Sequence, residues 1–189
     1  YAQELWVYDP SKDLPKYDSS NREWGVYSIA MSDDSNYIAV GLYRENAILD
    51  DKKNVLMDEQ GRLLLDKQSK IVMLDSKGKE LWEFKTQYEI ESIRMSGKGE
   101  YIVVDTASYG CFNDFEDCGS KVYVFNISGT PLWTYDGARN PYVDSFGNVL
   151  IATPNGTAIY DIEKKLIRRY SNDLDYIWAS DNLDLFVIP

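Results

Sequence analysis

Apolar residues occur along the chain in short runs separated by tight polar turns. In residues 70–84 (KIVMLDSKGKELWEF), one apolar run meets a turn built from Asp75, Ser76, Lys77 and Gly78, and a second apolar run leaves it. This pattern is typical of a β-hairpin. It recurs in residues 121–135 and, in degraded form, in residues 156–170, while residues 4–8 match only its second half. Self-similarity of this kind indicates a repeat protein.

A second hairpin pattern lies between the copies of the first. Its copies are residues 26–42, 90–106, 141–153 and 176–189, which align on Ser32, Ser96, Ser145 and Ser180. Two hairpins per unit give four strands, and the units recur at roughly the ~40 to 50 residue period of propeller blades. Long runs with helical periodicity are lacking. We therefore predict an all-β chain, a β-propeller built from four-stranded antiparallel blades.

The repeats also resemble a known family. The pattern xxLDxxGKxLW of residues 72–82, echoed in residues 124–133, resembles the repeats of quinoprotein-like (PQQ-like) β-propellers, and the turn at residues 32–40 looks like the inner hairpin of many propellers, WD40-like ones included. The resemblance implies that the outer-strand tryptophans, Trp6, Trp82 and Trp133, pack between neighbouring blades. It does not fix the function, because propellers host unrelated activities.

The 189 residues are expected to form one domain of about three and a half to four blades, residues 1–189. Residues 43–69 are predicted to form an inserted accessory hairpin with a turn at 59–61, and residues 107–120 a loop bracketed by cysteines. Both ends of the chain fall inside a repeat unit, and the first residue is not Met, so we expect an upstream segment. The ends could pair to close a small four-bladed ring, but we favour a larger ring because the family resembled usually has more blades.

Long polar segments are predicted to lie on one face of the propeller. Residues 9–25, 43–69 and 107–120 all occupy connections that open on the same side, whereas the other side has only tight turns. Binding residues usually lie on loops that a rigid scaffold holds in place. The working surface is therefore expected on the face with the long segments.

The formal net charge of −11 limits the choice of partners. Nucleic acids and anionic membrane surfaces bind basic patches, which this sequence lacks, so neither is an expected partner. The sequence also contains no apolar stretch of about 18 residues, the length that a membrane-spanning helix needs. We expect no membrane insertion within this chain.

Cysteines and glycosylation sequons favour an extracellular or cell-surface protein. Cys111 and Cys118 are the only cysteines and can close a small disulfide ring, which would indicate an oxidising compartment; two free thiols are the alternative. Asn126 (Asn-Ile-Ser) and Asn155 (Asn-Gly-Thr) lie in sequons and are candidate glycosylation sites.

The residue inventory argues against most kinds of catalysis. The chain has no His, which removes Ser-His-Asp and Cys-His arrangements and the usual zinc sites. No cofactor is expected: quinoprotein dehydrogenases hold their quinone, with calcium, on the axis of a complete eight-bladed ring, and this chain supplies about half of one. The remaining possibility is chemistry with carboxylates, either glycan hydrolysis or calcium binding. The candidate acidic residues lie in two loops: Asp50, Asp51, Asp58 and Glu59 in the first, and Asp114, Glu116 and Asp117 in the second.

Two functions stay open at this stage. The preferred one is a non-enzymatic extracellular or cell-surface scaffold that binds a protein, a glycan or copies of itself through its loops. The alternative is a hydrolase or lyase that acts on glycans with paired carboxylates. The candidate residues for contact with a ligand or partner are Trp24, Asp114, Glu116 and Asp117, and no metal ligand is assigned.

Overall fold

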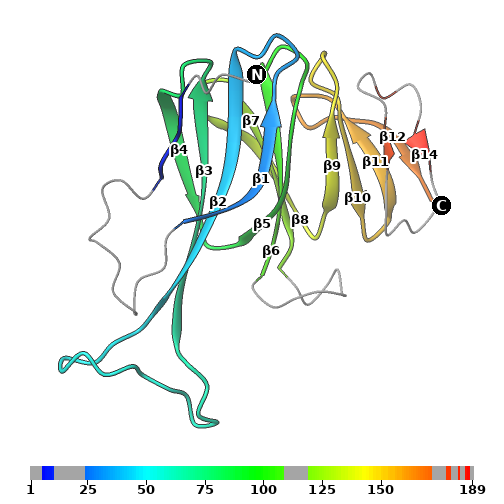
Figure 1. Cartoon of the computed structure of the whole chain (residues 1–189). Coiled ribbons are helices and arrows are strands. Elements are labelled where there is room, and N and C mark those ends of the chain that lie inside the picture. The colour runs from blue at the N-terminus through cyan, green and yellow to red at the C-terminus, as the bar shows by residue number, and fades with distance from the viewer. Residues whose placement is uncertain are drawn as a thin grey trace.

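The computed structural model describes residues 6–10, 24–108, 119–171, 178–179, 183 and 186–187. Every regular element in these residues is a β-strand, and the strands form three four-stranded antiparallel sheets and one two-stranded sheet. The sheets follow one another across the molecule, each with its strands in chain order or its reverse (Figure 1). The prediction of an all-β chain with four-stranded blades is therefore confirmed.

Each four-stranded sheet is one blade. The first blade consists of β1 (Gly25–Met31), β2 (Tyr37–Ala47), β3 (Leu65–Asp75) and β4 (Glu80–Thr86). The second consists of β5 (Glu89–Met95), β6 (Tyr101–Ala107), β7 (Lys121–Asn126) and β8 (Pro131–Asp136). The third consists of β9 (Arg139–Val143), β10 (Val149–Thr153), β11 (Gly156–Tyr160) and β12 (Leu166–Tyr170). The strands β13 (Trp178–Ala179) and β14 (Phe186–Val187) form the last hairpin.

The tight turns share one local design. An Asp or Asn begins each five-residue turn, and its side-chain oxygen accepts hydrogen bonds from the backbone N–H groups two and four residues later. The fourth residue has a positive φ, as at Gly78 (76°), which explains the glycine in the repeat. The first residues of these turns are Asp50, Asp58, Asp75, Asn126, Asp144 and Asp161.

One detail of the sequence alignment was wrong. Ser32 and Ser96 are buried and begin six-residue turns, in which the backbone N–H of the serine bonds to the carbonyl five residues later. In the third blade the buried residue at this position is Asp144, and Ser145 is exposed. The turn there is one residue shorter because Asp144 bonds to the carbonyl of Asn148, so the register of the alignment shifts by one.

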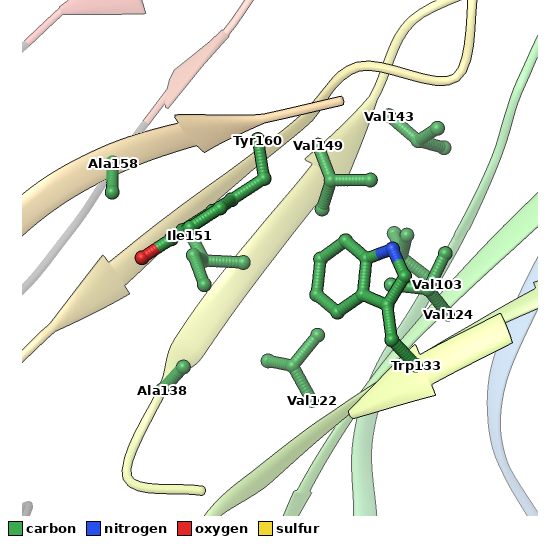
Figure 2. Close-up of a cluster of buried hydrophobic side chains, with 10 residues drawn as sticks. All are labelled: Val103, Val122, Val124, Trp133, Ala138, Val143, Val149, Ile151, Ala158 and Tyr160. Carbon is green, nitrogen blue, oxygen red and sulfur yellow. The ribbon is translucent and has the colours of Figure 1, made fainter. Parts of the chain in front are cut away.

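The core lies between the blades. Figure 2 shows the interface between the second and third blades, where Val122, Val124 and Trp133 face Val149 and Ile151. All five side chains are at least nine-tenths buried. A similar cluster joins the first and second blades around Ile71, Met73, Ile93 and Phe125. Each blade therefore buries apolar side chains of β-strands against its neighbour, which is the main stabilising interaction of such a fold.

Tryptophans of the outer strands fasten one blade to the next. The indole Nε1–H of Trp82 donates to the carbonyl of Ile127 at 2.8 Å, and that of Trp133 donates to the carbonyl of Ile162 at 2.9 Å. Trp6 makes the same bond to Ser76 of the first blade at 2.9 Å. The expectation that these tryptophans pack between repeats is confirmed for the two that join described blades.

The first blade has an uncovered side near its inner strand. Val26, Ile29 and Met31 of β1 are 57%, 60% and 56% exposed. Their counterparts in the second blade include Ile90 and Ile93, which are fully buried against the first blade. This side of β1 is therefore an exposed apolar strip, and the larger ring predicted from the repeats stays a prediction.

Candidate functional site

A long arm extends from the first blade. Its strands β2 and β3 are paired from Tyr37 with Asp75 to Ala47 with Leu65, so residues 43–69 continue the ladder of the blade itself. Figure 1 shows this hairpin projecting well beyond the other strands, on the side opposite the turns that join β1 to β2 and β3 to β4. Of the three long segments expected on one face, residues 43–69 are the one that the structure describes throughout, while the placing of residues 9–25 and 107–120 on that face stays a prediction. The division of the chain into a domain with an accessory insertion stays a prediction.

The end of the arm is a junction of three hairpin stems. The backbone N–H of Ile48 donates to Leu64, that of Leu64 donates to Leu56, and that of Leu56 donates to Ile48, at 2.8 to 3.0 Å. The three residues are eight positions apart, and two small loops branch from the junction. The loop at 58–62 is the turn that the sequence predicted at 59–61. The three backbone bonds among Ile48, Leu56 and Leu64 form a closed ring, which fixes the geometry of the tip.

The tip of the arm exposes apolar side chains. Six of them are between 36% and 59% exposed: Ile48, Val55, Leu56, Met57, Leu63 and Leu64. Exposed apolar residues are common singly, but a contiguous group on a projecting element is a feature of interaction sites. Exposed charged residues of both signs, such as Asp51, Lys52 and Glu59, lie beside them.

Two acidic residues of the arm, Asp50 and Asp58, have structural roles. Asp50 accepts hydrogen bonds from the side chain and backbone of Asn54 and from the backbone of Lys52, and these hold the pKa of Asp50 below its usual range. Bonds from Arg62 and Gln60 lower the pKa of Asp58 in the same way. Within the described residues no three His, Cys, Asp or Glu side chains gather as a metal site would require.

Trp24 lines a pocket at the base of the arm. The pocket has a volume of about 390 Å³ and lies against β2, β3 and β4. The guanidinium carbon of Arg44 lies 4.9 Å from the centre of the Trp24 ring, and the Lys70 ammonium lies 5.1 Å from it. Arg44 and Lys70 project from the same side of the sheet, since Arg44 pairs with Gln68 and Leu42 pairs with Lys70. Trp24, the aromatic residue singled out in the sequence, therefore lies over a cationic surface.

The pocket has an excess of positive charge in an acidic protein. Four cations, Arg44, Lys67, Lys70 and Lys85, line it together with one carboxylate, Glu83. Glu83 pairs with Lys70 at 2.9 Å and with Lys85 at 3.5 Å, and these charges lower the pKa of Glu83, the Lys70 hydrogen bond most of all. The remaining polar lining comes from Gln68, Ser69 and Thr86. Sequence reasoning missed these cations because they come from three strands and meet only once the register is known.

A buried carboxyl joins the second and third blades. Asp105 of β6 is 4% exposed, and its Oδ2 accepts the backbone N–H of Asn140 at 2.8 Å. Burial raises the pKa of Asp105 to about 7, with a further rise from Glu91, while the Asn140 bond and two arginines, Arg139 and Arg94, oppose the rise. A carboxyl whose pKa lies near neutral pH can serve acid–base chemistry. Because Asp105 lies in the blade interface and accepts a bond from a backbone N–H, we interpret it as a structural residue that links the two blades.

Several of the sites predicted from the sequence cannot be placed. Cys111, Cys118, Asp114, Glu116 and Asp117 lie outside the described residues, so the disulfide and the acidic ligand contacts stay predictions.

The two sequons differ in their surroundings. The side-chain oxygen of Asn126 accepts three hydrogen bonds inside its own turn, one from the backbone of Thr130 and two from Ser128. Asn155 is exposed in the turn between β10 and β11. Glycosylation stays a prediction at both, and Asn155 offers the more open acceptor.

No helix in the described residues is long and apolar enough to cross a membrane. No family model and no curated protein matches the sequence.

Two of the solved structures that resemble this chain are β-propellers. The Dos1 propeller aligns over 88% of this chain and 39% of its own length, with a TM-score of 0.55 and 11% sequence identity. The propeller domain of the trilobed protease from Pyrococcus furiosus, described as having an open velcro topology, aligns over 86% of this chain and 47% of its own, with a TM-score of 0.54 and 14% identity. This chain thus spans less than half of each. At these identities the similarity shows the fold alone: the chain has the fold of a β-propeller.

Proposed function

We propose that this chain is a non-enzymatic binding scaffold of the quinoprotein-like or WD40-like propeller type, which works outside the cell or on the cell surface. Its elaborated face holds a protein partner. The observation that carries the proposal is the arm, whose tip exposes six apolar side chains on a framework held by its own backbone hydrogen bonds. A rigid apolar centre bordered by charged residues is the composition of a protein-binding surface.

The partner expected at the tip is a protein with an apolar patch. The apolar tip residues come from two short loops and their junction, so they form a compact group that suits a complementary protein surface. Exposed charges of both signs around the group favour a protein rather than an anionic membrane, which would select basic residues alone. Of the four arm carboxylates considered for glycan hydrolysis, Asp50 and Asp58 are already engaged in turns.

The test replaces the apolar tip without breaking its fold. Met57 and Leu63 are bridged partners, so Met57→Lys with Leu63→Glu leaves an oppositely charged pair across the small loop and keeps the net charge. The matched control is Phe146→Gln, which removes an 80% exposed aromatic side chain from a tight turn on the opposite side. Immobilised protein would be exposed to cell-surface proteins of the source organism, and each retained protein would be identified, purified and titrated back.

Support requires saturable binding of a purified partner that weakens at least tenfold in the tip variant and is unchanged in the Phe146→Gln control. Binding that survives the tip variant would place the working surface elsewhere. Turnover of a glycan by the intact chain, lost on replacing Asp114, Glu116 and Asp117 together, would overturn the non-enzymatic assignment.

A further inference from the structure

The pocket beside Trp24 carries an inference that goes beyond the arm. Its lining combines an aromatic ring, four cations and three uncharged side chains with hydrogen-bonding groups. A volume of about 390 Å³ lies within the range of roughly 300 to 1,000 Å³ found for small-molecule sites. The space is therefore suited to a compact ligand of one or two rings.

The second blade shows which features of the pocket the fold itself requires. Tyr88 precedes β5 as Trp24 precedes β1, and the Lys121 ammonium lies 5.9 Å from the Tyr88 ring, so an aromatic residue beside a lysine recurs at this position. There, however, Lys121 pairs at 2.9 Å with Asp136, the residue opposite it on the next strand. This pair balances the charge of Lys121 among the described residues of the second blade.

The first blade replaces this balance with positive charge. Lys85 is the residue opposite Lys70, and it stands where the second blade has Asp136. Arg44 stands where the second blade has Ser108, as the registers of the two ladders show. Relative to the second blade, Arg44 thus adds one cation, Lys85 puts a cation in place of a carboxylate, and Glu83 adds a carboxylate where the second blade has Thr134. The balance of the three changes is still positive. Because the fold is built without them in the second blade, the excess of cations is a property of this site and not of the architecture.

Several polar groups of the site are held in place before any ligand arrives. The Arg44 guanidinium donates to the side-chain oxygen of Gln68 at 2.8 and 3.2 Å, and the Gln68 amide in turn donates to Asp66 at 2.6 Å. Lys70 is held by Glu83, and its side chain is only 13% exposed. Lys85 is 77% exposed and lies 3.5 Å from Glu83, so its ammonium can turn toward an incoming anion at little cost.

We propose that the pocket lined by Trp24, Arg44, Lys70 and Lys85 binds an acidic sugar. The carboxylate or sulfate of the sugar pairs with Arg44 and Lys85, since guanidinium and ammonium groups form strong charge-assisted bonds with such oxygens. The C–H face of the pyranose ring packs on Trp24, whose ring face carries partial negative charge. Thr86 and the Gln68 amide, whose nitrogen carries a second N–H, supply hydrogen-bonding groups for hydroxyls.

The experiment titrates the full chain with three probes that separate the parts of the ligand. Glucuronate has the ring and the charge, glucose has only the ring, and acetate has only the charge. Calorimetry gives the dissociation constants, and intrinsic fluorescence reports on the indole, with a Trp24→Phe variant to assign the signal among the five tryptophans. Raising the salt concentration should weaken glucuronate binding because exposed charges are screened.

The expected result is that glucuronate binds at least tenfold more tightly than glucose or acetate. Arg44→Gln and Lys85→Gln should each weaken that binding at least fivefold, whereas Lys79→Gln, which removes an exposed lysine from the tight turn after β3, should leave it unchanged. Equal binding of acetate and glucuronate would reduce the pocket to a site for simple anions and overturn the proposal. So would an absence of binding, or binding that Arg44→Gln and Lys85→Gln leave intact. The tip variant Met57→Lys with Leu63→Glu should not affect glucuronate, so failure here is distinguishable from failure of the proposed arm function.

Discussion

Replacing Trp133 tests how strongly one blade depends on the next. Trp133 is 9% exposed, and its ring packs among Val122, Val149 and Ile151 in the interface of Figure 2. A buried Trp removes about 150 to 250 Å² from water, which corresponds to about 4 to 6 kcal/mol at ~25 cal/mol per Å² as an upper bound. The bond to Ile162 contributes about 1 kcal/mol more.

Trp133→Ala is therefore expected to lower the free energy of unfolding by about 3 to 5 kcal/mol, the range found for such truncations. Urea titration followed by far-ultraviolet circular dichroism would measure the loss. Trp133→Phe is the control, because it keeps most of the ring and removes the N–H donor, and it should cost only about 1 to 2 kcal/mol. A loss below about 1 kcal/mol for Trp133→Ala would refute the reasoning that the interface depends on this side chain.

Two further changes test the turns and the buried carboxyl. Gly129→Ala should destabilise the chain by more than Gly61→Ala, because both have a positive φ but only at Gly129 would a Cβ lie 2.6 Å from the Trp82 ring; a urea titration that ranks them equally would contradict the close packing. The pKa of Asp105 is raised to about 7 in the folded chain against about 3.9 when unfolded, so the stability it supports is full below pH 4 and is lost as the pH rises to about 7. Asp105→Asn keeps an acceptor for Asn140 and should flatten that decline between pH 5 and 8, and a variant as pH-dependent as the parent would show that another group, such as Glu91, is responsible.

The hairpins could be predicted because their signals are local. Each turn is specified by the five residues that form it, as at 75–79, and the runs on either side alternate between the two sides of a sheet. The misalignment at Ser145 also arose from reading a local pattern. The turn in the third blade is one residue shorter, so its buried first residue is Asp144, and Ser145 beside it was aligned in its place. Local patterns give the strands but do not reveal small shifts of register.

The pocket and the tip of the arm could be predicted only in part. Trp24 was singled out as an aromatic residue outside the outer-strand pattern, but its cationic surroundings depend on pairing between residues far apart in sequence, such as Lys70 with Lys85. The turn at 58–62 was visible, whereas the junction of Ile48, Leu56 and Leu64 depends on backbone bonds between separate stems. An eight-residue spacing of apolar residues was the available signal, and it has meaning only once both turns are placed.

The tryptophan bonds between successive blades have a thermodynamic consequence. Each fastens a blade only to its immediate neighbour, as Trp82 does to Ile127 and Trp133 to Ile162, so cooperativity passes along the chain one interface at a time. The second blade alone has a described four-stranded neighbour on both sides. Opening of the first or third blade leaves the hydrogen bonds within the second blade in place, whereas opening of the second blade disrupts two interfaces at once. The amides of β6 and β7 should therefore exchange with solvent more slowly than those of the first and third blades, and the molecule should unfold from its flanks toward its centre.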